Sequence, residues 1–247
     1  MLGIIEKYLN IIQFFINIKI MKKKLKRYQH LLKGKLIDIG AGEAPYKSIF
    51  TACNSYTTTN TKRHYIQEGL ADVENSTDIW IEDGTAIPVD NESFDSVICL
   101  QVLSVIKDPE AFFNEVYRIL HKEGVFLLTT DFLYPKWSKE DVMRHTDTHL
   151  RNLAEKSGLE IIAIESFGGF WTMLHSNINR YIRSYPKEIK KSKTYLQAFF
   201  RVLFFLISLI ILPFFQIYGW FIYLFEKNKT NEFQYSMNTI LVAKKTS

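Results

Sequence analysis

The chain has 247 residues, two cysteines and a formal net charge of +5, a composition that suits one substantial domain and argues against a disulfide-stapled scaffold. The charge is uneven: residues 36–175 hold 11 basic and 22 acidic side chains, residues 1–35 hold nine and one, and residues 176–201 hold seven and one. The acidic middle segment argues against nucleic-acid binding, which needs a basic surface. The sequence shows no cluster of metal ligands. The positive charge of the flanking segments is typical of segments that face an anionic membrane surface.

Residues 1–20 are apolar on nearly all sides and are followed by a basic run at residues 22–27. A secretory signal would carry its positive charge in front and a small-residue cleavage site behind, so this segment is predicted to be retained. Residues 1–33 have the pattern of a basic amphipathic helix on a membrane surface. An ordinary helix packed on a sheet is the alternative.

Residues 34–185 alternate short apolar patterns with helical patterns. Strands are predicted near residues 35–39, 55–60, 96–100, 124–130 and 159–165, and helices at residues 109–120 and 147–157. Asp108 before Pro109 is a helix-start signal, and Gly158 is a helix stop. Strands separated by helical crossovers predict an α/β fold with a Rossmann-like, doubly wound and mostly parallel sheet.

The segment from residue 202 to residue 225 contains no formally charged side chain, and at about 1.5 Å per residue it could cross a bilayer. Residues 231–247 are predicted to form the final strand. If that strand joins the sheet, the chain leaves and returns on one side of a membrane, which excludes a single span. We therefore predict that residues 186–230 form an apolar, membrane-associated insert of two short helices bent at Pro213. A buried helical pair or a hydrophobic dimer interface is the alternative, so the oligomeric state stays open.

Residues 36–42, Leu-Ile-Asp-Ile-Gly-Ala-Gly, pass from a strand pattern into a glycine turn. Glycine has no Cβ and lets a ligand approach the main chain, and ligands of open α/β sheets bind beyond the carboxyl ends of the strands. Pro45 stands where a dinucleotide fingerprint has its third glycine, which disfavours a nicotinamide-dependent reductase. The turn is therefore the predicted cofactor site.

In order and spacing, residues 36–42, 82–88, 91–103 and 108–124 resemble the motifs of class I S-adenosylmethionine-dependent methyltransferases of the type 11 group. The resemblance covers roughly residues 35–170. It implies a seven-stranded sheet, S-adenosyl-L-methionine as cofactor and methyltransferase activity (EC 2.1.1.-). The segment from Arg144 to Thr146 and residues 167–171 further resemble methyltransferases of bacterial surface-polysaccharide and lipid biosynthesis.

The resemblance also assigns cofactor contacts. Asn60 stands where the family carries an acid that holds the ribose hydroxyls, and Asp83 stands at the position that accepts from the adenine amine. A turn or cap role is the alternative for Asp83. The complete set of predicted cofactor residues is Asp38, Gly40, Ala41, Gly42, Asn60, Asp83, Gly84 and Gln101.

Asp131 and His145 follow the predicted fifth strand and are candidate general bases for a hydroxyl acceptor, with a structural role as the alternative for His145. With the apolar insert, the resemblance predicts an amphiphilic or lipid-linked acceptor, of a glycan-lipid or quinone type. The enzyme would then be peripheral or monotopic on the cytoplasmic side of the cell membrane. A catalytically silent methyltransferase-like scaffold or partner subunit is the alternative, because Asn60 and Val105 depart from the family pattern.

Overall fold

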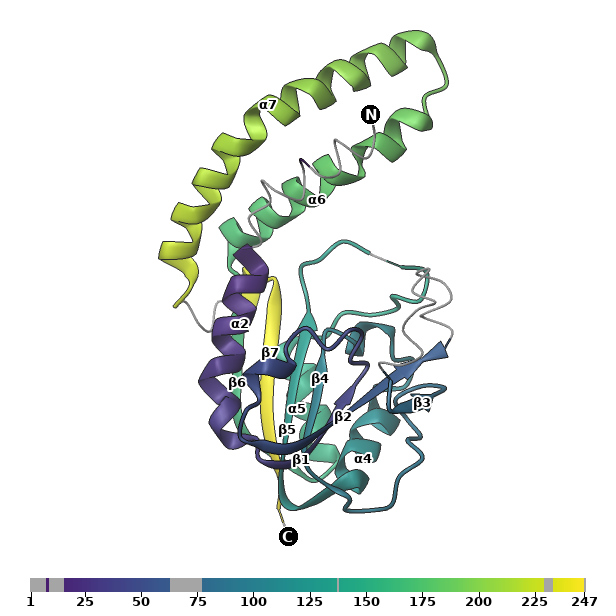
Figure 1. Ribbon diagram of the computed structural model, residues 1–247, viewed down its shortest axis with the longest axis vertical. Helices are drawn as coiled ribbons and strands as arrows, with labels where there is room; N and C mark the ends of the chain where they lie inside the picture. The colour runs from purple at the N-terminus through teal and green to yellow at the C-terminus, as the bar shows by residue number, and fades with distance from the viewer. Residues whose placement is uncertain (1–7, 9–15, 63–76, 137, 229–232, 247) are drawn as a thin grey trace.

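The computed structural model describes residues 8, 16–62, 77–136, 138–228 and 233–246. Within these residues one seven-stranded sheet has the order β3-β2-β1-β4-β5-β7-β6 (Figure 1). Only β7 runs antiparallel to its neighbours, so the doubly wound, mostly parallel sheet predicted from the sequence is confirmed. The strands are β1 Gly34–Ile39, β2 Cys53–Thr61, β3 Ile79–Ile81, β4 Phe94–Leu100, β5 Leu120–Asp131, β6 Leu159–Phe167 and β7 Asn238–Lys245.

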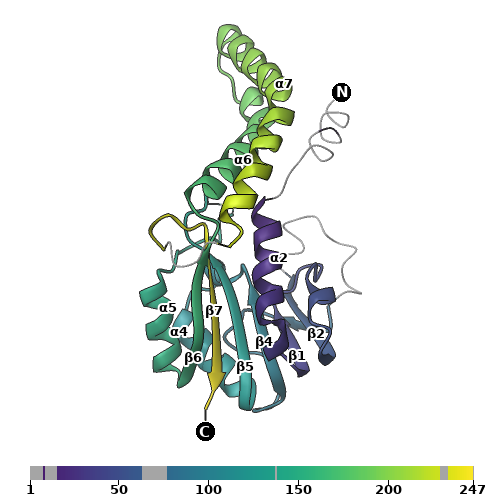
Figure 2. The same ribbon diagram turned by 90° about the vertical axis from the view of Figure 1, so that its left-hand side faces the viewer.

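Helices cover both faces of the sheet. Figure 2 shows α4 and α5 on one face and α2 on the other, while α6 and α7 project from the sheet as a hairpin. Short 3-10 turns link several elements, among them Leu103–Val105 after β4 and Phe233–Tyr235 before β7. The helices are α2 Ile16–Tyr28, α4 Pro109–Ile119, α5 Asp147–Lys156, α6 Phe170–Lys190 and α7 Tyr195–Glu226.

The alternation of side chains along β5 explains the two-sided core. Phe126 and Leu128 are fully buried in the cluster that includes α4 and α5, whereas Leu127 is fully buried in the cluster that includes α2. Successive side chains of a strand point to opposite faces, so an unbroken apolar run requires cover on both sides. The strand predicted near residues 124–130 is therefore confirmed as part of β5.

The helix ends also follow the sequence signals. Asp108 accepts a hydrogen bond from the Ala111 amide at 2.9 Å, with Pro109 as the first helical residue of α4. Helix α5 ends just before Gly158, which has a φ of +84°. The predicted caps of both helices are therefore confirmed.

Helix α2 is packed on the sheet rather than lying free on a surface. Ile16, Ile20 and Leu25 are almost completely buried in the same cluster as the β-strand residues of that face. Lys24, which is 4% exposed, forms an ion pair of 2.8 Å with Glu165 of β6. For residues 16–28 the sheet-packed alternative is therefore correct, and the rest of the predicted N-terminal segment, residues 1–7 and 9–15, lies outside the described residues.

The apolar insert differs from its prediction in two respects. The predicted boundary at residue 186 falls inside α6, so the helical hairpin begins at Phe170. The predicted break at Pro213 is wrong, because α7 continues through Pro213 as one gently curved helix (Figure 1). Proline removes a single helix hydrogen bond, and the burial of Leu212 and Phe205 against α6 holds the turns before it in place.

The hairpin is anchored at the carboxyl edge of the parallel strands. It follows β6 at that edge, and β7 starts there after the return of the chain. Glu226, at the end of α7, is 2% exposed and accepts hydrogen bonds from the Thr172 amide at 2.8 Å and the Thr172 hydroxyl at 2.5 Å. The last turn of α7 is thereby tied to the first turn of α6, which fixes the base of the hairpin beside the sheet.

Candidate cofactor and acceptor site

The glycine turn after β1 has the backbone conformation that its sequence predicts. Gly40 has a φ of +73° and Gly42 a φ of +57°. A Cβ on Gly40 would lie 2.6 Å from Cγ2 of Val102, whereas a Cβ on Gly42 would meet no atom of the described residues within 4 Å. Gly40 is therefore required by close packing, and the described residues leave room for a ligand beside Gly42.

Asp38, two residues before the turn, has a buried carboxyl group that is 3% exposed. Its Oδ2 accepts a hydrogen bond of 2.5 Å from the Tyr56 hydroxyl, and its Oδ1 has no hydrogen-bond partner among the described residues. Burial raises the pKa of Asp38 to about 7, although the bond from Tyr56 opposes that rise. A buried carboxylate oxygen without a partner is suited to bind a positively charged group. Tyr56 was not predicted as a site residue, and a Tyr in a polar strand carries no specific signal of this role.

The three amides of the turn are directed to β2. The Gly40 and Ala41 amides each donate to the Thr59 carbonyl at 3.0 Å, and the Gly42 amide donates to Asn60 Oδ1 at 2.8 Å. Asn60 is 3% exposed and also donates from Nδ2 to the Gly42 carbonyl at 3.3 Å. The sequence predicts cofactor contacts at Gly40, Ala41, Gly42 and Asn60, and the structure brings these four residues together at the ends of β1 and β2.

Asp83 and Gly84 lie after β3. Asp83 is exposed, and its Oδ1 accepts from the Thr85 amide at 2.8 Å and from the Thr85 hydroxyl at 2.5 Å. This is the turn role considered for Asp83 from the sequence, while its adenine contact stays a prediction. Gly84 is buried, and a Cβ there would lie 3.0 Å from the Phe112 ring, so close packing explains this glycine.

Gln101 follows β4 in a strained conformation, with a φ of +63°. Its amide donates to the Thr129 carbonyl at 2.8 Å, and its side-chain Nε2 is buried without a hydrogen-bond partner among the described residues. Strain of this kind costs about 1 kcal/mol or more and is concentrated at functional sites. Gln101 is therefore well placed to donate to a ligand beyond β4.

Asp131, at the end of β5, forms part of a charged cluster. Arg144 lies 3.3 Å from Asp131 Oδ2 and pairs with both carboxylate oxygens of Asp141. Burial raises the pKa of Asp131, and the charge of Arg144 opposes that rise. From α6, Arg180 stacks over the Tyr134 ring at 4.3 Å, so the hairpin contacts the loop that follows Asp131.

His145, the other candidate base, is fully buried, and its Nδ1 lies 3.2 Å from Nδ1 of His149. Burial, and then the neighbouring His149, lower the pKa of His145 to about 4. The imidazole is therefore neutral at physiological pH and is a weak proton acceptor. This environment favours the structural alternative for His145, whereas Asp131 keeps the properties expected of a base.

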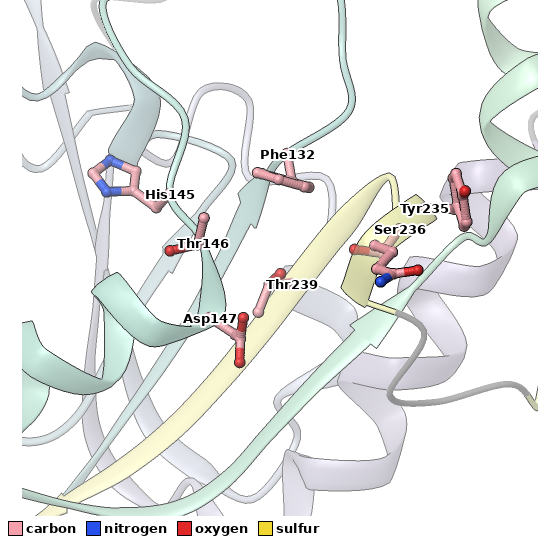
Figure 3. Close-up of a pocket in the computed structure, with 8 residues that line it drawn as sticks. Phe132, His145, Thr146, Asp147, Tyr235, Ser236 and Thr239 are labelled. Carbon is pink, nitrogen blue, oxygen red and sulfur yellow. The ribbon is translucent and has the colours of Figure 1, made fainter.

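A pocket of about 410 Å³ opens next to these residues, between the start of α5 and the segment that precedes β7 (Figure 3). His145 lies at one side of it and Tyr235 at the opposite side. Among the described residues no group of three or more His, Cys, Asp or Glu side chains could hold a metal ion. The pocket is lined by Phe132, His145, Thr146, Asp147, Gln234, Tyr235, Ser236 and Thr239.

Comparisons with known proteins agree with this geometry. Residues 37–128 match the family model of a methyltransferase domain, and no curated protein matches the chain. Phosphoethanolamine N-methyltransferase 2 of Haemonchus contortus, solved with S-adenosyl-L-methionine, is 16% identical with a TM-score of 0.55; the match covers 90% of this chain and 51% of that one, so this chain spans about half its length.

A second solved structure, a SAM-dependent methyltransferase from Thermotoga maritima, is 12% identical with a TM-score of 0.55. That match covers 100% of this chain and 96% of the other. The chain therefore has the fold of class I methyltransferases, with the matched domain extending from β1 into β5.

Proposed function

We propose that this chain, which carries a methyltransferase domain, transfers a methyl group from S-adenosyl-L-methionine to an amphiphilic or lipid-linked acceptor at the cytoplasmic face of a membrane. The observation that carries the proposal is the position of the hairpin. It projects from the same edge of the sheet as the glycine turn and Asp131, so an apolar surface lies next to the reaction site.

The residues at the ends of β1 and β4 fit the cofactor that the methyltransferase domain implies. Asp38 Oδ1 offers a buried acceptor to its positive charge, Gln101 Nε2 offers a donor, and the space beside Gly42 admits a ligand close to the main chain. When bound, S-adenosyl-L-methionine supplies the methyl group on a positively charged sulfur. The chain's own task is to hold the acceptor atom in line with that methyl group.

Asp131 is the group best placed to take a proton from a hydroxyl acceptor. Its carboxyl is buried at the end of β5, and its raised pKa brings it closer to the pH at which it must work. The positive charge of Arg144, 3.3 Å from the carboxylate, stabilises the ionised form. Arg180 adds a cation on the hairpin side, which favours an acceptor that carries an anionic group such as a phosphate.

Helix α7 has the surface expected of a membrane-bound element. It is the one helix among the described residues that is long and apolar enough to cross a membrane, and only 17% of its most apolar window is buried. A core helix of a soluble protein would be mostly buried. Its most exposed apolar side chains are Tyr195, Leu196, Phe199, Ile210, Phe214 and Phe225.

The charges at the tip favour a hairpin that lies in one leaflet. Lys190, Lys191, Lys193 and Arg201 surround the turn between α6 and α7, at the end far from the sheet. A hairpin inserted across the membrane would carry these cations through the apolar interior, at roughly 2.5–3.5 kcal/mol each. Lying along the surface, the same cations contact anionic headgroups and leave the hairpin base open to acceptors from the bilayer.

A scaffold without catalysis is the competing function, because the neutral Asn60 is engaged by the main chain of Gly42. Calorimetric titration with S-adenosyl-L-methionine separates the two functions. A catalytic protein binds the cofactor and transfers its methyl group to a lipid fraction. Folded protein that binds no cofactor would contradict the enzymatic proposal.

A further inference from the structure

The main-chain amides of Gly40, Ala41 and Gly42, which a ligand at the glycine turn would approach, all donate hydrogen bonds within the protein. Gly40 and Ala41 donate to the carbonyl of Thr59, and the hydroxyl of Thr59 also lies 3.3 Å from the Gly40 amide. Gly42 donates to Asn60. The last residues of β2 therefore hold the main chain of the turn after β1.

Asn60 uses both N–H groups of its side-chain amide, and one of the two lone pairs of its amide oxygen, in hydrogen bonds within the protein. Its Oδ1 accepts from the Gly42 amide at 2.8 Å, and its Nδ2 donates to the Gly42 carbonyl at 3.3 Å and to the Thr77 hydroxyl at 3.0 Å. The pair with Gly42 needs an acceptor and a donor on one short side chain, which an amide supplies. A carboxylate would direct an oxygen at the Gly42 carbonyl in a site that is 3% exposed.

We propose that Asn60 is a positioning residue that holds the glycine turn through the main chain of Gly42, and that it does not bind the ribose hydroxyls of the cofactor. This inference rests on the proposed cofactor. It also explains why an uncharged residue occupies this position. Asparagine stabilises the turn in the folded protein, whereas an acid at residue 60 would place a carboxylate oxygen against the carbonyl oxygen of Gly42, and neither atom can donate a hydrogen bond.

The test compares Asn60→Asp and Asn60→Ala with the wild type, and uses Asn91→Asp as the matched control. Asn91 is an exposed residue that accepts a bond from Arg118, a role that an aspartate retains. Thermal unfolding without ligand is measured first. Asn60→Asp should lower the Tm by about 5 °C and Asn91→Asp should leave it nearly unchanged. An unchanged Tm in Asn60→Asp would contradict a positioning role for Asn60. This measurement needs no cofactor.

Calorimetry with S-adenosylhomocysteine, well below each Tm, then separates positioning from ribose binding. Positioning predicts that Asn60→Asp binds about tenfold more weakly, whereas a ribose-binding role predicts tighter binding, because a carboxylate accepts stronger hydrogen bonds from hydroxyls. The 2′-deoxyribose analogue gives a second readout. Its affinity relative to the parent should be the same in Asn60→Ala as in the wild type. The inference would be overturned if Asn60→Ala no longer distinguished S-adenosylhomocysteine from its 2′-deoxyribose analogue, or if Asn60→Asp bound S-adenosylhomocysteine more tightly. A wild-type protein that binds neither compound would instead contradict the proposed function.

Discussion

Asp131 and Asn238 face each other across the antiparallel β5–β7 pair, so the candidate base lies beside the point where the chain returns from the hairpin. Phe167 pairs with Asn238 from the other side, and α6 begins three residues later at Phe170. Both ends of the hairpin are therefore within two strands of Asp131. This relationship lets an apolar surface and a polar reaction site serve the same acceptor.

The exposed face of α7 should be required for membrane binding. Ile210 and Phe214 are 71% and 69% exposed, so Ile210→Glu with Phe214→Glu should leave the fold intact. A charged side chain in the apolar part of a membrane costs roughly 2–3 kcal/mol, and co-flotation with anionic vesicles should fall more than tenfold. The control, Thr148→Glu with Asn152→Glu on the exposed face of α5, adds the same charge and should float like the wild type. Equal flotation of both variants would contradict a lipid-facing α7.

Asp38 should make stability depend on pH. Its folded pKa of about 7 exceeds the ordinary value of 3.8, so the folded state holds an extra proton between these pH values. The stability it contributes is present in acid and is lost as the pH rises through this window. Relative to Asp38→Asn, the free energy of unfolding of the wild type should fall between pH 4 and 8 by up to about 4 kcal/mol. Urea unfolding at several pH values measures this difference, and parallel profiles would contradict it.

The same substitution should weaken cofactor binding. Asp38→Asn keeps an acceptor for Tyr56 but removes the negative charge. Affinity for S-adenosyl-L-methionine at pH 8 should fall about tenfold, and wild-type affinity should rise between pH 6 and 8 as Asp38 ionises. Affinity that is unchanged by the substitution would show that Asp38 serves the fold alone.

Gly40 and Gly42 should respond differently to alanine. In Gly40→Ala the new Cβ would lie 2.6 Å from Val102, so we expect a loss of about 2–4 kcal/mol in the free energy of unfolding. In Gly42→Ala the Cβ meets no atom of the described residues within 4 Å, so stability should fall by about 1 kcal/mol while cofactor affinity falls more than tenfold. Gly42→Ala with wild-type affinity would contradict a ligand beside this turn.

Glu226 should hold the hairpin to the sheet. Replacing its carboxylate in Glu226→Gln removes charge-assisted bonds to Thr172 and should destabilise the hairpin base by about 1–2 kcal/mol. Limited proteolysis should then cut the hairpin faster than in the wild type. Glu188→Gln near the tip, where the carboxylate pairs with an exposed Lys191, is the control and should be cut at the wild-type rate.

The sequence predicted what depends on local pattern. Local signals, each within a few residues of the element that it shapes, predicted the apolar run of β5, the cap at Asp108 and the helix stop at Gly158. The glycine turn could likewise be located, because positive φ values restrict the choice of residue.

The remainder depends on contacts between distant segments. The hydrogen bonds between Asn60 and the main chain of Gly42 could not be predicted, since no local pattern tells which partner an amide selects. Proline usually ends a helix, and the continuity of α7 through Pro213 relies on packing against α6, which periodicity does not reveal. Because α6 carries many polar side chains, the sequence pattern did not show that it pairs with the apolar α7 to form the hairpin.

Transfer of a radiolabelled methyl group from S-adenosyl-L-methionine to vesicles of a bacterial total lipid extract tests the central claim most directly. The wild type should place the label in the chloroform-soluble fraction, and the variant with Ile210→Glu and Phe214→Glu should bind the cofactor normally but label that fraction at least tenfold less. Label that appears only in the aqueous fraction, or equal labelling by both proteins, would contradict a methyltransferase that takes its acceptor from the membrane.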